Sequence, residues 1–142
     1  AKPVFAQDAG IAHEWWGANG EDIWFVNYAN GTEKVSIETG IREVVWANGT
    51  CHSHASKEGR QLVGDIGTYS WAETGCRVAF YDIEQKRELN IATDLPVPRW
   101  ARGDYHIDPH PQFCADDQLI AYTTTVRGTV DVAFCVVVDL RK

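Results

Sequence analysis

Short stretches in which apolar and polar residues alternate recur along the whole chain, and turn dipeptides separate them: Asn19-Gly20, Asn30-Gly31, Asn48-Gly49 and Glu58-Gly59. Alternation with a period of two is typical of β-strands, and Asn-Gly favours the tight turn of a hairpin. We find no long segment with apolar residues at helical spacing and a capping signal. The pattern therefore predicts an all-β chain of short antiparallel strands.

The predicted strands repeat one plan three times. Each round is an antiparallel meander of about 45 to 50 residues, the size of one β-propeller blade. We expect blades at residues 11–49, 50–98 and 99–142, with residues 1–10 as a stray edge strand. The third round ends before a fourth strand, and closed propellers need about four to eight blades. We therefore expect a partial propeller domain that belongs to a longer chain or assembles with further copies of itself.

The stretch from Asp104 to Phe113 concentrates two imidazoles and two carboxylates. Its two prolines fix φ, and we expect them to hold the backbone extended, so that His106, Asp108 and His110 share one face. A carboxylate with neutral imidazoles suits Mn, Zn or Fe(II). The alternative is a polar loop whose histidines are only hydrogen-bonded.

Three histidines also occur in matching register. His13, His54 and His110 each lie five or six positions before the first turn of their round. The first strand of every propeller blade lines the central channel, so this register predicts that the three imidazoles meet at the axis. Three histidines in register favour a functional site over three isolated structural residues.

The composition limits the classes of binding partner that we expect. A net charge of -7 and a pI near 5.1 exclude a nucleic-acid backbone as the expected partner, because phosphate binding needs clustered Lys and Arg. No apolar run is long enough for a membrane span, and no signal peptide is visible.

The four cysteines show no CxxC spacing, and we expect them to be reduced rather than paired in two disulfides. A chain that begins at Ala1 and contains no Met is expected to be processed, trimmed after tagging, or part of something longer.

Several motifs resemble one known family. They are Ala12-His13-Glu14-Trp15-Trp16, then Cys51-His52-Ser53-His54-Ala55-Ser56 with Leu62-Val63-Gly64-Asp65, then Asp108-Pro109-His110-Pro111-Gln112-Phe113 with Tyr122-Thr123-Thr124. Their order and spacing are similar to the C-terminal blades of the oligogalacturonate lyases. The resemblance covers roughly residues 10 to 138. It implies a seven-bladed propeller with a divalent metal, typically Mn, that binds an acidic sugar at the channel mouth.

The resemblance also implies a set of metal ligands. His13 and His110 match family ligands directly, and Asp108 stands where the family has the first His of an HPHP pair. Tyr105 stands where a ligating Gln would be, so His106 or His54 is a possible substitute. The expected metal residues are therefore His13, Asp108, His110 and His106, with Mn as the cofactor and Zn or Fe as alternatives.

The implied reaction is β-elimination from a uronic-acid sugar, as in pectin degradation. His54 is the candidate base or metal neighbour, and Arg102 is the candidate carboxylate-binding residue, with Arg77 and Arg99 as alternatives that also fit solvent-facing loops. The family's own base and substrate-binding Arg lie in earlier blades that this chain does not contain. The alternative functions are a non-catalytic propeller fragment or sugar- and metal-binding assembly module, and a metal-dependent hydrolase.

Partners and location follow from the same resemblance. We expect an acidic oligosaccharide substrate, no nucleic acid and no membrane, together with a homo-oligomer or the remainder of a longer propeller. The family is usually intracellular, which predicts a cytoplasmic location with periplasmic and secreted locations left open. Trp15, Trp16 and Trp24 are candidates either for stacking on sugar rings or for packing between blades.

Overall fold

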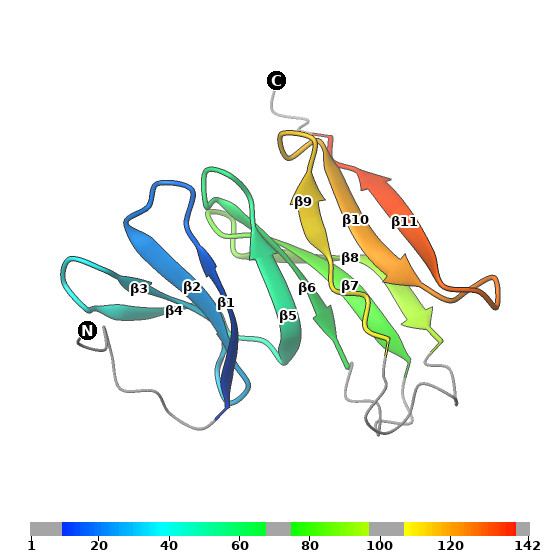
Figure 1. The fold of residues 1–142 in the computed structure, drawn as a ribbon, viewed down its shortest axis with the longest axis horizontal. Coiled ribbons are helices and arrows are strands. Elements are labelled where there is room, and N and C mark those ends of the chain that lie inside the picture. Colours follow the sequence, from blue (N-terminus) through cyan, green and yellow to red (C-terminus); the bar gives the residue numbers. More distant parts are fainter. Residues whose placement is uncertain (1–9, 68–74, 97–106, 139–142) are drawn as a thin grey trace.

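The computed structural model describes residues 10–67, 75–96 and 107–138. These residues form three antiparallel sheets and no helix (Figure 1), which confirms the all-β prediction. The first sheet contains β1 (Ile11–Trp16), β2 (Asp22–Asn27), β3 (Gly31–Ser36) and β4 (Arg42–Trp46). The second contains β5 (Thr50–Ala55), β6 (Gln61–Ile66), β7 (Cys76–Asp82) and β8 (Arg87–Leu95). The third contains β9 (Gln112–Cys114), β10 (Leu119–Thr124) and β11 (Asp131–Val136).

Three of the four glycines in the turn dipeptides, Gly20, Gly31 and Gly59, have the positive φ that favours glycine. Gly20 and Gly59 have φ of 71° and 65°, a region that side chains with a Cβ rarely enter. At Gly31, with φ of 109°, a Cβ would also lie 2.2 Å from the carbonyl oxygen of Trp46. The hairpins therefore depend on glycine both for conformation and for close approach of the backbone.

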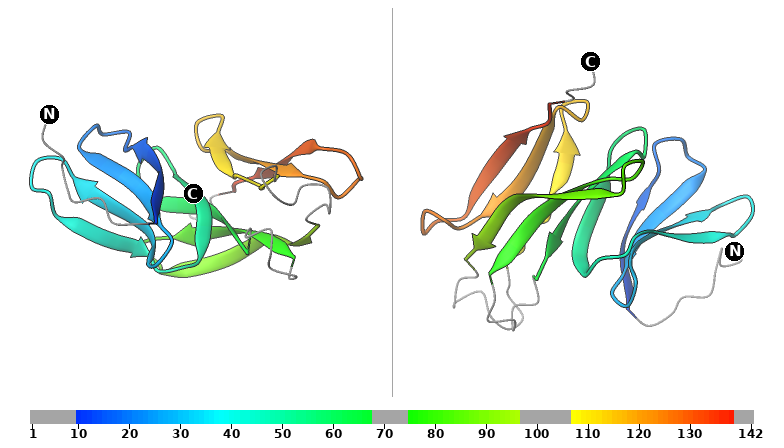
Figure 2. Two further views of the ribbon diagram at one scale, coloured as in Figure 1. Left: turned by 60° about the horizontal axis from the view of Figure 1, so that its bottom comes forward. Right: turned by 180° about the vertical axis from the view of Figure 1, so that it is seen from behind.

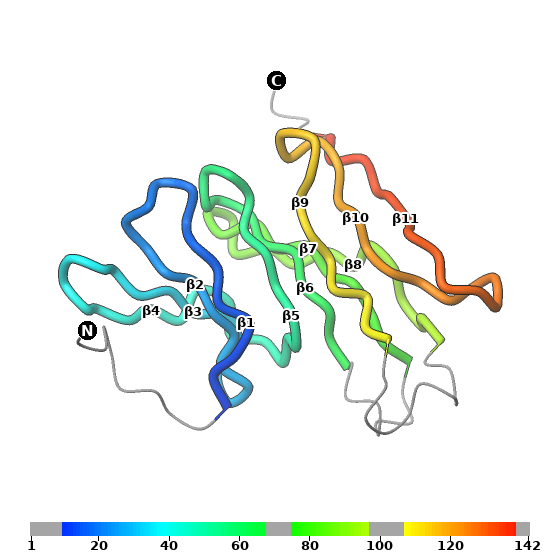
Figure 3. The backbone as a smooth tube through the Cα atoms, viewed as in Figure 1, coloured from blue at the N-terminus to red at the C-terminus, as the bar shows by residue number. Residues whose placement is uncertain are grey.

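Consecutive strands are neighbours in every sheet, so each sheet is a simple meander. The sheets lie side by side and fan out around β1, β5 and β9, their first strands (Figures 1 and 2). The backbone trace leads from β4, at the opposite edge of the first sheet from β1, directly into β5 of the second sheet (Figure 3). Side chains on these three inner strands are therefore brought together from distant parts of the sequence.

Apolar clusters hold neighbouring sheets together. Between the first and second sheets, Trp24, Trp46, Ala55, Leu62 and Ala79 form one buried cluster. Between the second and third sheets, a second cluster contains Val63, Cys76, Val78, Leu95, Phe113 and Ile120. The first junction also contains a hydrogen bond of 2.7 Å between the buried hydroxyl groups of Thr32 and Ser53. Large aromatic and branched side chains therefore fill the spaces between sheets, as in a close-packed interior.

The third sheet has three strands, and β11 is at its edge. Val132, Phe134 and Val136 alternate along β11 and are 62–66% exposed. Such a row would be buried if another strand or sheet packed against it. The candidate edge strand at residues 1–10 lies, except for Gly10, outside the described residues.

All four cysteines are free, in agreement with the expectation of reduced thiols. Among the described residues there is no helix long and apolar enough to cross a membrane.

Candidate metal centre

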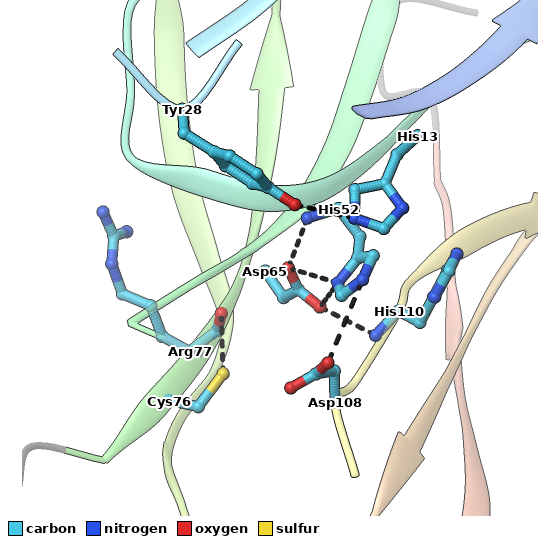
Figure 4. Close-up of polar contacts among 8 residues, drawn as sticks. All are labelled: His13, Tyr28, His52, Asp65, Cys76, Arg77, Asp108 and His110. Atoms are coloured by element: carbon cyan, nitrogen blue, oxygen red, sulfur yellow. Dashed lines mark hydrogen bonds and ion pairs between the residues drawn. The ribbon is translucent and has the colours of Figure 1, made fainter. Parts of the chain in front are cut away.

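The site is built around a buried carboxylate on β6. Asp65 pairs with His52 of β5 in the sheet register and is fully buried. Its Oδ1 accepts a hydrogen bond of 2.8 Å from the backbone N–H of His52, and its Oδ2 lies 2.9 Å from Nδ1 of the same residue (Figure 4). Asp65 therefore fixes the orientation of the His52 ring and leaves Nε2 for other partners.

His110 reaches the same carboxylate from the third sheet's side. Its backbone N–H donates to Asp65 Oδ2 at 2.8 Å, and its ring stacks on that of His52 with centroids 4.1 Å apart. The prediction that residues 104–113 are continuously extended is wrong within the described part: β9 begins only at Gln112, and His110 has φ of 44°. The reason is that Pro109 and Pro111 have no N–H for a strand ladder. The hydrogen bond to Asp65 accompanies this left-handed conformation.

His13 completes a group of three imidazoles. It lies at a bulge in β1 with φ of 58°, and its ring centroid is 4.2 Å from that of His52 and 6.1 Å from that of His110. Its Nε2 is 2.9 Å from the hydroxyl oxygen of Tyr28, which follows β2. β1, β5 and the segment that leads into β9 thus each contribute one imidazole to the centre.

Two further groups border the histidines. Asp108 Oδ2 lies 3.9 Å from His52 Nε2, and both side chains are largely buried. Cys51, His13 and His52 each have a potential ligand atom, and these atoms lie within 4.8 Å of one another. Figure 4 shows the imidazoles and Asp108 directed toward a common region, while the Arg77 side chain points away from it.

Charge is divided unequally among the three histidines. Burial alone would lower the pKa of His52, but its hydrogen bonds to Asp65 and Cys51 outweigh burial and raise this pKa to about 10. Burial, and then the neighbouring imidazoles, lower the pKa of His13 and of His110. In the metal-free protein near neutral pH, the centre therefore holds one imidazolium paired with Asp65 and two neutral imidazoles.

The sequence-predicted residues separate into four groups. His13, Asp108 and His110 lie in the centre. His54 lies further along β5, where its Nδ1 accepts a hydrogen bond of 3.2 Å from the backbone N–H of Phe113. His106 and Arg102 lie outside the described residues, as do Tyr105 and Arg99. Arg77 forms an ion pair with Glu88 at 2.6 Å and is not part of the centre.

Sequence reasoning missed His52 and its partner Asp65. Counting five or six positions back from the first turn selects His54. His52 is nevertheless the residue that matches His13, because each lies seven positions before the glycine of its turn, Gly59 and Gly20. The available signal was the second imidazole of the His52-Ser53-His54 motif together with Asp65 of the next strand.

The donor set is compatible with a divalent transition metal. Imidazole nitrogens, a carboxylate oxygen and a thiol are ligands for Zn, Fe(II) or Mn, and the Asp65–His52 contact is the outer-shell arrangement common to metal-binding histidines. His13 and His110 are neutral and ready to bind, whereas His52 would have to lose a proton first. The residues present therefore fit a metal site.

No protein-family model matches the chain, and no curated protein matches its sequence. Its structure is similar to that of an oligogalacturonate lyase in complex with manganese, with a TM-score of 0.75 and 19% identity, over 97% of this chain and 38% of that one. An oligogalacturonate lyase from Vibrio parahaemolyticus gives 0.74 and 20%, over 99% of this chain and 40% of that one. The chain has a β-propeller fold. TolB from Acinetobacter baumannii supports this, with a TM-score of 0.70 and 15% identity over 92% of this chain and 31% of that one.

The three sheets are thus propeller blades, and the histidine centre lies on their inner strands. The chain spans about two fifths of the length of the lyase structures that it matches. At these identities the likeness establishes the propeller fold, and the activity has to be argued from the centre.

Proposed function

We propose that this propeller segment forms the metal-binding part of a lyase that cleaves uronic-acid oligosaccharides of the oligogalacturonate type by β-elimination. The observation that carries the proposal is the meeting of His13, His52 and His110, one from each blade, around the buried Asp65. The likeness of the fold to oligogalacturonate lyases supports it.

In this proposal His13, His52 and His110 hold a divalent metal, with Mn preferred and Zn or Fe as alternatives. Asp108 is a neighbouring oxygen ligand, and His106 is a further candidate. The bound cation would neutralise the C6 carboxylate of the sugar and thereby make the C5 proton easier to remove. Asp65 orients His52 through Nδ1 and accepts the His110 N–H, so it positions two of the three proposed ligands.

His54 and Arg102 are the proposed substrate-facing residues. Because Nδ1 of His54 accepts the Phe113 N–H and burial lowers the pKa of His54, the ring is neutral with its proton on Nε2. In this tautomer His54 is arranged to donate a hydrogen bond to the sugar rather than to remove the C5 proton. Arg102 is proposed to bind a sugar carboxylate. The base is proposed to come from blades outside this chain.

Metal binding is the first test. The chain, stripped with EDTA, is titrated with Mn²⁺ and followed by electron paramagnetic resonance. We expect about one ion per chain, loss of binding in His52→Ala, and unchanged binding in the matched control His54→Ala. If His13→Ala no longer binds Mn²⁺, His13 is a metal ligand. If His13→Ala still binds Mn²⁺ but has lost activity, His13 is a substrate-facing residue. A chain that binds neither Mn²⁺ nor Zn²⁺ contradicts the proposal.

Because the base is proposed to lie outside this chain, activity is tested separately with oligogalacturonate and the metal-loaded chain assembled with the further blades of its propeller. A lyase produces 4,5-unsaturated ends that absorb in the near ultraviolet, whereas a hydrolase produces reducing ends without that absorbance. New absorbance supports the proposed reaction, and reducing ends alone contradict it. Metal and sugar binding without turnover would identify the chain as a binding module.

A further inference from the structure

A cavity of about 460 Å³ opens next to the turns that join β1 to β2 and β5 to β6. It lies beyond the histidine centre along the same inner strands: Trp15 follows His13 on β1, and His54 follows His52 on β5. Its lining includes Trp15, Trp16, Trp24, Lys34, His54 and Asp117. Its volume is within the range of small-ligand sites, roughly 300 to 1,000 Å³.

Three indole rings give the cavity flat apolar surfaces. Trp24 is only 4% exposed and stacks on Trp15, with centroids 6.0 Å apart and planes at 17°. Trp16 is different, because 67% of it is exposed and it is available to a ligand. A large exposed aromatic beside a cavity is typical of binding surfaces, whereas packing between blades accounts for Trp24.

Hydrogen-bond donors accompany these rings. The indole Nε1 of Trp15 is buried and has no hydrogen-bond partner within the described part of the chain. Leaving such a donor unsatisfied is costly, and a ligand oxygen or a water in the cavity would accept its hydrogen bond. The Nε2–H of neutral His54 is a second donor.

The cations on the cavity wall are already paired. The ammonium group of Lys34 lies 3.3 Å from a Glu43 carboxylate oxygen and 5.6 Å from the centre of the Trp24 ring. Lys57 lies 3.8 Å from Asp116 and donates its backbone N–H to Asp117. Asp117 itself lines the cavity, so a carboxylate ligand would meet paired cations and a further negative charge. The cavity therefore suits an uncharged ligand rich in hydroxyl groups.

We propose that this cavity binds a neutral pyranose ring, with Trp16 stacking on the sugar and the Trp15 indole N–H donating to a sugar oxygen. The cavity shares His54 with the proposed lyase site but contains none of the three proposed metal-binding histidines, and it does not depend on a metal.

The test uses the 142-residue chain with cellobiose, maltose and lactose as neutral probes and digalacturonate as the acidic probe. Binding is followed by the ¹⁵N-indole resonances of the tryptophans. We expect at least one neutral disaccharide to bind at millimolar concentration and to shift the Trp15 and Trp16 resonances. Loss of the ring in Trp16→Ala should weaken binding about fivefold to tenfold. Trp15→Phe keeps an aromatic ring but removes the N–H, and should weaken binding about threefold to tenfold.

Phe134→Ala is the matched control, because Phe134 on β11 is also a large exposed aromatic residue, at 63%, and is not among the residues that line the cavity, so its loss should leave sugar binding unchanged. The proposal is overturned if no neutral disaccharide binds, if binding survives Trp16→Ala unchanged, or if digalacturonate displaces the neutral sugars. Mn²⁺ titration of the same Trp16→Ala protein separates the two sites. Unchanged metal binding together with lost disaccharide binding supports the sugar-binding proposal, whether or not the lyase proposal holds.

Discussion

Replacing Asp65 by Asn tests the charge arrangement of the histidine centre. The Asp65 carboxylate is fully buried and accepts hydrogen bonds from Nδ1 and the backbone N–H of His52 and from the backbone N–H of His110. Asn preserves the shape but removes the negative charge and exchanges one acceptor oxygen for a donor NH₂ group. The variant therefore loses the ion pair and places a donor against at least one N–H group.

The size of the expected loss of stability follows from the pKa of His52. A rise from 6.5 to about 10 corresponds, at about 1.4 kcal/mol per pH unit, to about 5 kcal/mol of preference for the imidazolium in the folded state. Because the folded-state pKa is raised, this stabilisation is complete below pH 6.5 and disappears as the pH rises through about 10. At neutral pH, Asp65→Asn should cost about 3 to 5 kcal/mol, as does removal of one partner from a buried pair.

The assay is urea unfolding of the EDTA-treated chain between pH 6.5 and 10, with histidine NMR to follow His52. The free energy of unfolding of the wild type should fall across this interval relative to that of Asp65→Asn. Asp117→Asn is the matched control, because Asp117 also accepts a backbone N–H from a neighbouring blade, at 2.7 Å, but has no hydrogen bond to an imidazole. Parallel pH profiles for the wild type and Asp65→Asn would refute the reasoning.

Three further outcomes are expected. Mn²⁺ binding at pH 7 should release about one proton from His52. Calorimetry in buffers of different ionisation enthalpy detects this release as a binding heat that depends on the buffer. Identical binding heats in all buffers would show that His52 does not deprotonate. Glu33→Gln should destabilise the chain by about 2 kcal/mol in urea unfolding, because Glu33 is buried and accepts two hydrogen bonds from Arg42. Hydrogen bonds outweigh burial and lower the pKa of Glu33, so its stabilisation is present above pH 4.5 and is lost on acidification through the folded-state pKa, an acid sensitivity that the variant should lack. Glu88→Ala should cost about 1 to 2 kcal/mol and shift Trp46 fluorescence, because Glu88 Oε2 accepts the Trp46 indole N–H at 3.0 Å across the first two blades; an unchanged spectrum would contradict this.

The strands were predictable because they depend on local patterns. Alternation and turn glycines indicate the antiparallel strands of the first two sheets, since side-chain direction in a strand and φ at a turn glycine are set by near neighbours. The short β9 is the exception. There Pro109 and Pro111 have no N–H to donate to β10, and the His110 N–H bonds to Asp65 of another blade, so the strand begins only at Gln112.

The centre was predictable only in part because its contacts are long-range. His13 and His110 follow from their motifs, but alternation places His52 and His54 on the same face of β5, and only the contacts of His52 with Asp65 and His110 distinguish the two. Asp65 is also polar within a buried strand, and its role emerges only when His52 and His110 are seen to share it. The raised pKa of His52 follows from its hydrogen bonds to Asp65 and Cys51, which outweigh burial.

The location of one imidazole on each blade has a consequence for folding. Propeller blades contact mainly their neighbours, so repeat structures of this kind can open one unit at a time. An ion held by His13, His52 and His110 would bind only when all three blades are docked, and its binding free energy would therefore add to the stability of the assembled state. Partial openings that separate any blade would be suppressed together. Metal would then convert three successive unfolding steps into a single cooperative transition.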